Sequence, residues 1–346
     1  MATVKEIAEK TGYSKATISR VLSNDPSFTV SGEAREKIQV CAENLHYVYK
    51  NRKAVLEKSS FTQHKVGIIP IGLESTDRGE LQDPYYLYIR NGVEARLDEI
   101  GIHTARVISM NKAEDYEKLE GMDSIIVIGK RNFEVQNPYF QKLKNVIFVD
   151  YDFDSCKYDC VLSNFSDAVD AAMNYLMDRG YRNIGYIGSW DYVNDFSSEK
   201  MIRRMDTRQI AFENYARSKE LNFRHFMYIG DKFTKAVGYE LAKQAILTGN
   251  LPEVFLIGSD PMALGVYRAF GEAGIRIGKD IGLVSIDGIE DTAYMSPPLT
   301  TVMVYAYQMG RSAVDCLTQR IEGRPIPVKV ILPVQLMERE SCKKEV

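Results

Sequence analysis

The sequence predicts an α/β protein, with a small helical head followed by a body of two lobes, each built on a parallel, doubly wound sheet. Two observations predict this fold. From about residue 62 to residue 340, short apolar runs alternate with helical stretches, which is typical of parallel sheets covered by helices. These roughly 280 residues are too many for one comfortable core, so two lobes are expected.

The strands of the body are expected at near-continuous apolar runs, because strands buried on both faces carry few polar residues. Helices lie between them, and ligands of such sheets bind at the carboxyl ends of the strands. The predicted strands cover residues 66–70, 125–128, 146–149, 184–187, 254–257, 281–286 and 330–334, and the predicted helices cover 88–99, 165–179, 207–219, 236–247 and 262–273.

The first 58 residues contain three helical patterns. Thr3 and Glu6 fit a capping box that starts the first helix, and Gly12 supplies the turn that ends it. Ser14 is expected to cap the second helix, and Ser31 to begin the third. The helices are predicted from residue 4 to near 12, from 15 to about 22 and from 31 to about 44.

The spacing of Ala8, Gly12 and Ile18 fits a helix-turn-helix, in which a small residue lets two helices approach and a branched residue packs beneath the turn. The second helix exposes side chains that suit base edges and phosphates, namely Lys15, Thr17, Ser19 and Arg20. Residues 1–58 carry ten Lys and Arg against seven Asp and Glu, which favours a polyanionic partner. A three-helix cap without a ligand is the alternative.

The composition of the chain argues against a membrane protein, a secreted protein and an enzyme. The chain is 45% hydrophobic and 26% charged, and no run of about 18 apolar residues predicts a membrane helix. The charged N-terminus does not resemble a signal peptide, and five scattered cysteines suit a reducing cytoplasm. The four histidines form no visible triad or metal set, and no phosphate-binding glycine loop occurs, so no enzyme, metal or cofactor is expected.

Motifs in the head and in the body resemble one family, in order along the whole chain. Residues 2–8, 14–22 and 30–31, and residues 176–188, 259–265, 285–287 and 297–302, are similar to the lactose/galactose-repressor (LacI/GalR) family of transcriptional regulators. The resemblance implies a body like the periplasmic sugar-binding proteins. The implied domains are a helix-turn-helix domain over 1–49, a hinge over 50–63 and an effector-binding and dimerisation domain over 64–340, with lobe 1 at about 64–162 and 292–323 and lobe 2 at about 163–290 and 325–340.

The resemblance also implies a set of DNA contacts. Lys15, Ala16 and Arg20 are expected in the major groove of an operator. Phosphate contacts are expected from Thr3, Ser14, Thr17, Asn24, Ser31 and Tyr47. The hinge lacks the proline that family members usually carry after the tyrosine. Leu56 is the candidate for the leucine that the family inserts into the minor groove, and the alternative is a linker residue that packs on the body.

Three polar residues match the sugar-binding positions of the family, namely Asp150, Arg208 and Asp287. A carboxylate accepts hydrogen bonds from adjacent hydroxyls, and a guanidinium donates to two sugar oxygens. Two asparagines of the family are replaced, by Ser259 and Ile128. The expected effector site also contains Asp260, Phe233 as an aromatic platform, and Tyr85 and Tyr86, which either line the cleft or pack on the lobe surface.

The function that the resemblance implies is a homodimeric repressor, released from a pseudo-palindromic operator by a sugar. Residues 82–92 are similar to family members that control galactose and β-galactoside operons, so galactose or a β-galactoside is the favoured effector. A dimer is favoured over a tetramer because no heptad extension follows the strand at 330–334. A sugar-binding receptor without DNA function is the alternative.

Overall fold

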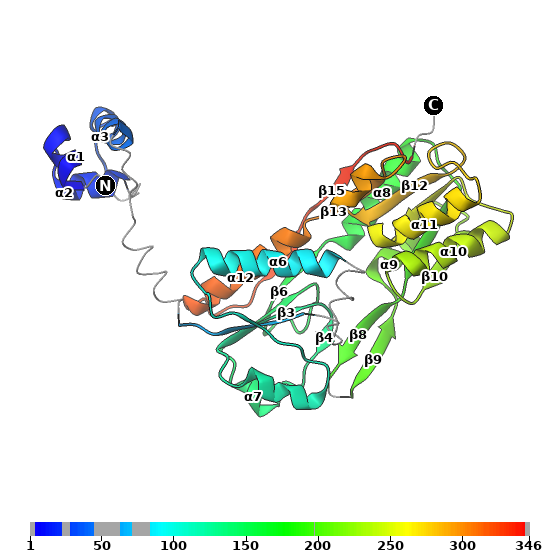
Figure 1. Cartoon of the computed structure of the whole chain (residues 1–346), viewed down its shortest axis with the longest axis horizontal. Coiled ribbons are helices and arrows are strands. Elements are labelled where there is room, and N and C mark those ends of the chain that lie inside the picture. The colour runs from blue at the N-terminus through cyan, green and yellow to red at the C-terminus, as the bar shows by residue number, and fades with distance from the viewer. Residues whose placement is uncertain (1–3, 23–27, 45–62, 71–83, 197, 343–346) are drawn as a thin grey trace. The chain divides into compact units, whose positions relative to one another are not determined.

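The computed structural model describes residues 4–22, 28–44, 63–70, 84–196 and 198–342 of the chain (Figure 1). It divides into two compact units, Met1–Gln63 and His64–Val346. We call the first unit the head and the second unit the body, and each is described by itself.

The head is a three-helix unit, made of α1 (Val4–Thr11), α2 (Lys15–Leu22) and α3 (Gly32–Asn44). The predicted helices are thus confirmed. Gly12 has a φ of 82°, a left-handed conformation that lets the chain turn between α1 and α2. The hydroxyl of Ser14 accepts a hydrogen bond from the amide of Thr17 at 3.1 Å, which caps α2. One small core holds the unit together, formed by Ile7, Ile18, Val21, Ile38 and Ala42.

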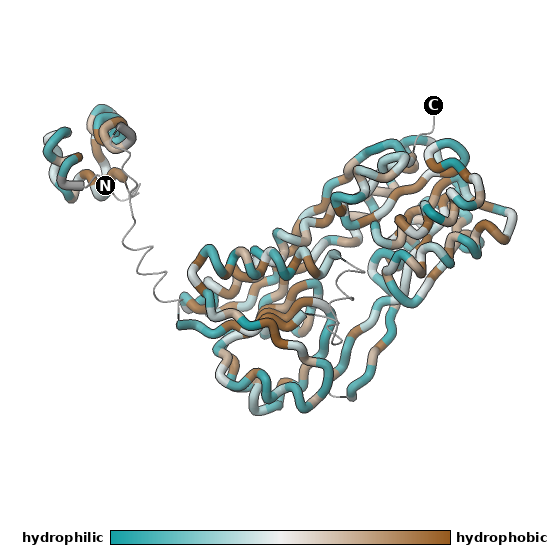
Figure 2. The backbone as a smooth tube through the Cα atoms, in the orientation of Figure 1, coloured by the Kyte–Doolittle hydropathy of each residue, from teal (hydrophilic) through white to brown (hydrophobic). Residues whose placement is uncertain are grey.

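The first lobe of the body contains a six-stranded sheet in which all pairings are parallel. Helices α6 (Pro84–Glu99) and α12 (Ala306–Ile321) pack against each other beside this sheet (Figure 1). Figure 2 shows strongly hydrophobic backbone segments within the sheet. In spatial order the strands are β14 (Lys329–Leu332), β6 (Asp159–Ser163), β5 (Asn145–Val149), β3 (Ser124–Ile128), β1 (Val66–Ile69) and β2 (Arg106–Val107).

The second lobe has a six-stranded sheet of its own, parallel except for its last strand. In spatial order the strands are β10 (Met227–Gly230), β7 (Ile184–Ser189), β11 (Val254–Ile257), β12 (Gly282–Asp287), β13 (Thr300–Val304) and β15 (Val334–Met337). Its helices are α8 (Phe165–Asp178), α9 (Thr207–Ser218), α10 (Lys235–Leu247) and α11 (Asp260–Glu272). The first six strands and all five helices predicted for the body are therefore present.

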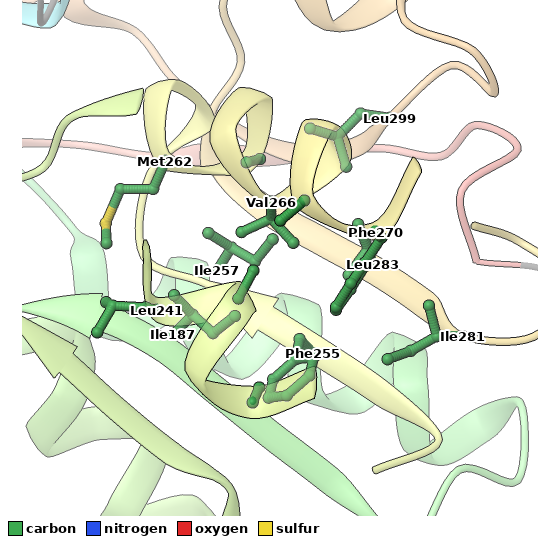
Figure 3. Packing of buried hydrophobic residues seen from close by; sticks show 14 of the residues in the cluster. Ile187, Leu241, Phe255, Ile257, Met262, Val266, Phe270, Ile281, Leu283 and Leu299 are labelled. Carbon is green, nitrogen blue, oxygen red and sulfur yellow. The ribbon is translucent and has the colours of Figure 1, made fainter. Parts of the chain in front are cut away.

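The core of the second lobe forms where α11 lies on the sheet (Figure 3). Met262, Val266 and Phe270 recur on one face of the helix and meet Ile257 and Leu283 of the strands. All five side chains are fully buried. This core fixes the strand ends and helix starts that carry the polar residues described below.

The final predicted strand and the lobe boundaries after residue 290 were wrong. Residues 330–334 form no single strand, because Pro333 separates β14 from β15 and the two belong to different sheets. Residues 300–304, expected in lobe 1, form β13 and pair with β12 in the second lobe. The chain returns to the first lobe only at α12, so its later crossings lie near residues 305 and 333 instead of near 291 and 324, where the predicted lobe bounds place them.

A third, smaller sheet was not predicted. It consists of β4 (Arg131–Asn132), which follows β3 of the first lobe, and the hairpin of β8 (Asp191–Asp195) and β9 (Lys200–Arg204), which follows β7 of the second lobe. Strand β9 is exposed at every position, so its sequence lacks the apolar pattern of a buried strand.

Candidate effector site and DNA-contacting surface

Two aspartates stand at the carboxyl ends of strands in unusual backbone conformations. Asp150 follows β5 with a φ of 64°, and Asp287 ends β12 with a φ of 130°. Positive φ is costly for residues with a side chain and is concentrated at functional sites. Both side chains are largely buried, and both positions are those expected for ligand-binding groups in parallel sheets.

Asp150 is bound by the two tyrosines from the start of α6. The Tyr85 hydroxyl donates to Oδ1 at 3.1 Å, and the Tyr86 hydroxyl donates to Oδ2 at 2.9 Å. Burial and the charges of Asp150 and Asp287 hold the pKa of Tyr85 well above its usual value, so its hydroxyl stays protonated. Both tyrosines therefore contact Asp150, and Tyr85 also lines the pocket described below.

Arg208 lies in the first turn of α9 and is nearly inaccessible, with 6% exposure. Its Nε donates to Asp206 at 2.8 Å, one terminal nitrogen donates to the Gly258 carbonyl at 2.8 Å, and that same nitrogen lies 3.9 Å from Asp287. Burial opposes the charge, but Asp206 and Asp287 raise the pKa of Arg208 well above its usual value. The arginine is therefore a fixed cation and no ordinary surface side chain.

Two aromatic rings flank this guanidinium. Its central carbon lies 4.0 Å from the ring centroid of Phe233 and 4.6 Å from that of Phe165. The Phe165 ring is also 6.0 Å from the ring of Tyr85, which joins the residues of the two lobes. Phe233, which was predicted as an aromatic platform for the effector, thus lies beside Arg208, whereas Phe165 was missed because its sequence is that of an ordinary helix start.

Asp260 has a different place from the other expected effector residues. It is fully buried, and its carboxylate accepts hydrogen bonds from Thr301 at 2.7 Å and from Ser285. The amides of Gly288 and Ile289 donate to its second oxygen at 2.7 and 2.8 Å. Burial raises the pKa of Asp260 to about 6 against these hydrogen bonds, which lower it. We therefore assign Asp260 to holding the Asp287 loop and not to touching an effector.

The two residues that stand in place of the family's asparagines have structural roles in this chain. The Ser259 hydroxyl accepts from the amide of Met262 at 3.4 Å and caps α11. Ile128 is completely buried at the end of β3. Neither residue provides the amide group that the resemblance led us to expect.

Lys130, two residues beyond β3, is a largely buried cation beside Asp150 that sequence reasoning missed. Its side chain is 12% exposed, and its Nζ lies 3.1 Å from Asp191 and 3.7 Å from Asp150. Burial lowers the pKa of Lys130, but Asp150, Asp191 and Asp206 together raise it above its usual value. A polar residue just past a buried strand was the available signal.

A pocket of about 440 Å³ adjoins these residues, within the size range of small-molecule sites. Tyr85 and Asp287 belong both to its wall and to the polar cluster. The remaining wall is mostly aromatic or apolar and is formed by Tyr88, Gly288, Ile289, Glu290, Met303, Val304, Tyr305, Ala306, Tyr307 and Gln308.

In the head, the predicted DNA contacts that the structure describes lie on its surface. Lys15, Ala16 and Arg20 of α2 are exposed, as is Ser14 at the helix start. The guanidinium of Arg20 lies 5.2 Å from the ring centroid of Phe28. Thr17 is half-buried and its hydroxyl pairs with that of Ser14, while Ser31 is exposed and caps α3. Thr3, Asn24, Tyr47 and Leu56 lie outside the described residues.

Within the described part of the chain, no helix is both long enough and apolar enough to cross a bilayer. In the same residues, no group of three His, Cys, Asp or Glu side chains is placed to hold a metal ion.

Known proteins match both units of the chain. Residues 3–49 match the family model "Bacterial regulatory proteins, lacI family", and residues 173–342 match "Periplasmic binding protein-like domain". The HTH-type transcriptional repressor MelR of Bacillus subtilis is 37% identical over 99% of this chain and 98% of its own length. The chain belongs to the LacI family. The regulator GalR of Streptococcus thermophilus is 32% identical over 99% of this chain and all of its own length.

Solved structures agree on the fold of this LacI-family member. The lac repressor dimer bound to operator and the anti-inducer ONPF superposes with a TM-score of 0.65, at 22% identity and with 98% of each chain covered. That likeness covers the helix-turn-helix head and the two-lobed, periplasmic-binding-protein-like body with parallel sheets, so the predicted fold class is confirmed.

Membership decides the class of function. The LacI-family chain is a DNA-binding transcriptional repressor with a sugar-responsive body, and its matched relatives are regulators instead of enzymes. The family binds operator DNA and acts as dimers, as the operator-bound lac repressor dimer illustrates. The prediction of a regulator is therefore confirmed.

Proposed function

We propose that this LacI-family repressor is released from a pseudo-palindromic operator when galactose or a β-galactoside binds in the cleft between its lobes. One observation carries the proposal. The Tyr85 hydroxyl donates to Asp150 of the first lobe, Tyr85 and Asp287 of the second lobe line the same pocket, and Arg208 lies 3.9 Å from Asp287. Carboxylates and a guanidinium fork, beside the rings of Phe165 and Phe233, suit a polyol with one apolar face.

The proposed mechanism couples the cleft to the hinge in a cytoplasmic homodimer. Two copies of α2 enter successive major grooves, with Lys15, Ala16 and Arg20 at the bases and Leu56 at the operator centre. Sugar binding changes the angle between the lobes and separates the hinges, which lowers operator affinity. By linkage, operator DNA must weaken sugar binding by the same factor, typically about 5- to 150-fold.

Operator binding across a salt series, with and without galactose or lactose, tests the proposal. The full-length protein first selects its operator from random-sequence duplexes, and the affinity for that duplex is then measured by fluorescence anisotropy. We expect log K to fall linearly with log salt, and either sugar to weaken binding. An operator affinity that is the same with and without each sugar would refute the effector assignment. An operator affinity that does not depend on salt would refute the DNA contacts. A sugar receptor without DNA function would select no duplex.

Substituting Arg20→Ala on α2 should weaken operator binding by about 1–3 kcal/mol, because a guanidinium at a base edge or phosphate is lost. Arg268→Ala is the matched control, since that arginine is exposed on α11 of the body and forms a surface pair with Glu272. Both variants are titrated with the selected duplex. Equal losses would show that α2 has no special part in DNA binding.

A further inference from the structure

The hairpin of β8 and β9 originates in the second lobe but is attached to the first. Strand β8 pairs with β4 of the first lobe, with Arg131 opposite Asn194. The amide of Asn194 donates to the Lys130 carbonyl at 3.0 Å, and the amide of Phe196 donates to the Asn132 carbonyl at 3.2 Å. Figure 1 shows the hairpin extending from the second lobe toward the first.

Phe196 anchors the hairpin in the core of the first lobe. Its side chain is 1% exposed, and its ring centroid lies 5.2 Å from that of Phe133 and 6.1 Å from that of Tyr116. The guanidinium of Arg131 lies 5.3 Å from the same ring centroid. The residues of the hairpin therefore keep their place relative to the first lobe, although the chain enters and leaves the hairpin from the second.

The base of the hairpin positions Lys130. Asp191 accepts a hydrogen bond from Lys130 at 3.1 Å through one oxygen and from Arg204 at 2.9 Å through the other. Among the described residues, Asp191 is the hydrogen-bond partner of Lys130 Nζ, and Asp150 lies just beyond hydrogen-bond distance at 3.7 Å. An ammonium group has three donors, so Lys130 retains donors on the side of Asp150.

We propose that Lys130 is a further effector-binding residue and that the β8–β9 hairpin, anchored by Phe196, holds it in place. This inference rests on the proposed function. A sugar hydroxyl beside Asp150 donates to the carboxylate while its oxygen, or that of the adjacent hydroxyl, accepts from Lys130. Asp150 and Lys130 together therefore bind two neighbouring hydroxyls, and Asp191 acts as the positioning residue of Lys130.

The charges around the cleft define the class of effector. The cations Lys130, Arg204 and Arg208 are each paired with a carboxylate, and those carboxylates belong to Asp150, Asp191, Asp206 and Asp287. A phosphorylated sugar would add negative charge where, among the residues that the structure describes, no cation is in surplus. The effector is thus an uncharged saccharide, and galactose 6-phosphate should bind more weakly than galactose.

Titration calorimetry with galactose, lactose and galactose 6-phosphate tests the role of Lys130. Lys130→Met should weaken binding of the neutral sugar by about 10- to 100-fold, the usual effect of losing a hydrogen bond from a charged donor. Lys144→Met is the control, because Lys144 belongs to the same lobe, is 69% exposed and pairs with Asp123.

The hairpin is tested by amide hydrogen exchange, which needs no ligand. Phe196→Ala should accelerate exchange at Asn194 and residue 196, whose amides bond to the first lobe, and should also weaken sugar binding. Phe140→Ala is the control, since Phe140 is a buried ring of the same core, 5.3 Å from Phe133, but belongs to α7 (Pro138–Gln141). Equal exchange and equal affinity loss in the two variants would overturn the anchoring role.

The outcomes separate this inference from the proposed function. A wild-type protein that binds none of the three sugars would overturn the proposed function and the role of Lys130 with it. A wild-type protein that binds a neutral sugar, with Lys130→Met binding it equally well, would overturn this inference alone. Tighter binding of galactose 6-phosphate than of galactose would overturn the charge argument.

Discussion

Replacing Arg208 by methionine should abolish the sugar response and destabilise the body by about 3–5 kcal/mol. The guanidinium is buried between two rings and neutralises Asp206 and Asp287, so its removal leaves buried carboxylates without their counter-charge. Methionine keeps much of the side-chain volume, which restricts the change to charge and hydrogen bonding. Urea denaturation of the full chain measures the stability, and calorimetry with galactose or lactose measures the binding.

Arg217→Met in the same helix is the matched control. Arg217 is 51% exposed and pairs with Glu213 across one turn, and such surface pairs contribute about 0–1 kcal/mol. The control should fold and respond to sugar normally. If Arg208→Met retained full stability and sugar affinity, the assignment of Arg208 as the central cation of the cleft would be wrong.

Gly265→Ala should destabilise the second lobe by about 3 kcal/mol. A Cβ at this position of α11 would overlap the Lys235 carbonyl oxygen of α10, and Gly238 of α10 approaches the Met262 carbonyl in the same way. The two helices lie so close that their backbones nearly touch, so alanine forces them apart. Thermal and urea unfolding of the full chain measure the loss.

Gly271→Ala near the end of the same helix provides the contrast. A Cβ there meets no heavy atom within 4 Å, so alanine should stabilise the helix by about 0.5–1 kcal/mol through its lower backbone entropy. If Gly265→Ala lowers the free energy of unfolding and Gly271→Ala raises it, the close contact between α10 and α11 is established as the cause of the loss. A Gly265→Ala variant with an unchanged free energy of unfolding would show that α10 and α11 can separate without a loss of stability.

The sequence was sufficient to predict the fold where apolar residues form continuous runs. Buried strands such as Val254–Ile257 are continuous apolar runs, so the strands that end beside Asp150 and at Asp287 could be predicted from the sequence. The effector roles of Asp150, Arg208, Asp287 and Phe233 were inferred through the resemblance, because the contacts among such residues join segments distant in the chain.

The sequence was insufficient where pairing partners decide the structure. Strand β13 begins Thr300-Thr301 and was not recognised as a strand, although both threonines are completely buried. The exposed strand β9 has no apolar alternation, and its pairing with β8 determines its conformation. The role of Asp260 was also hidden, because four donors from other segments meet at its carboxylate.

The break at Pro333 has a consequence for the order in which the body assembles during synthesis. Strand β14 covers the edge of β6, with Val330 opposite Val161, so the first sheet stays open until nearly the whole body has been translated. The segment between β6 and α12 meanwhile supplies β7, β10, β11, β12 and β13 of the other sheet. Strand β15, which pairs with β13 at the edge of that sheet, follows β14 in the chain, so both sheets present an unpaired strand edge until the end of the body is translated, and an open edge invites pairing with other chains. Nascent chains stalled before Lys329 would be the aggregation-prone form of this repressor.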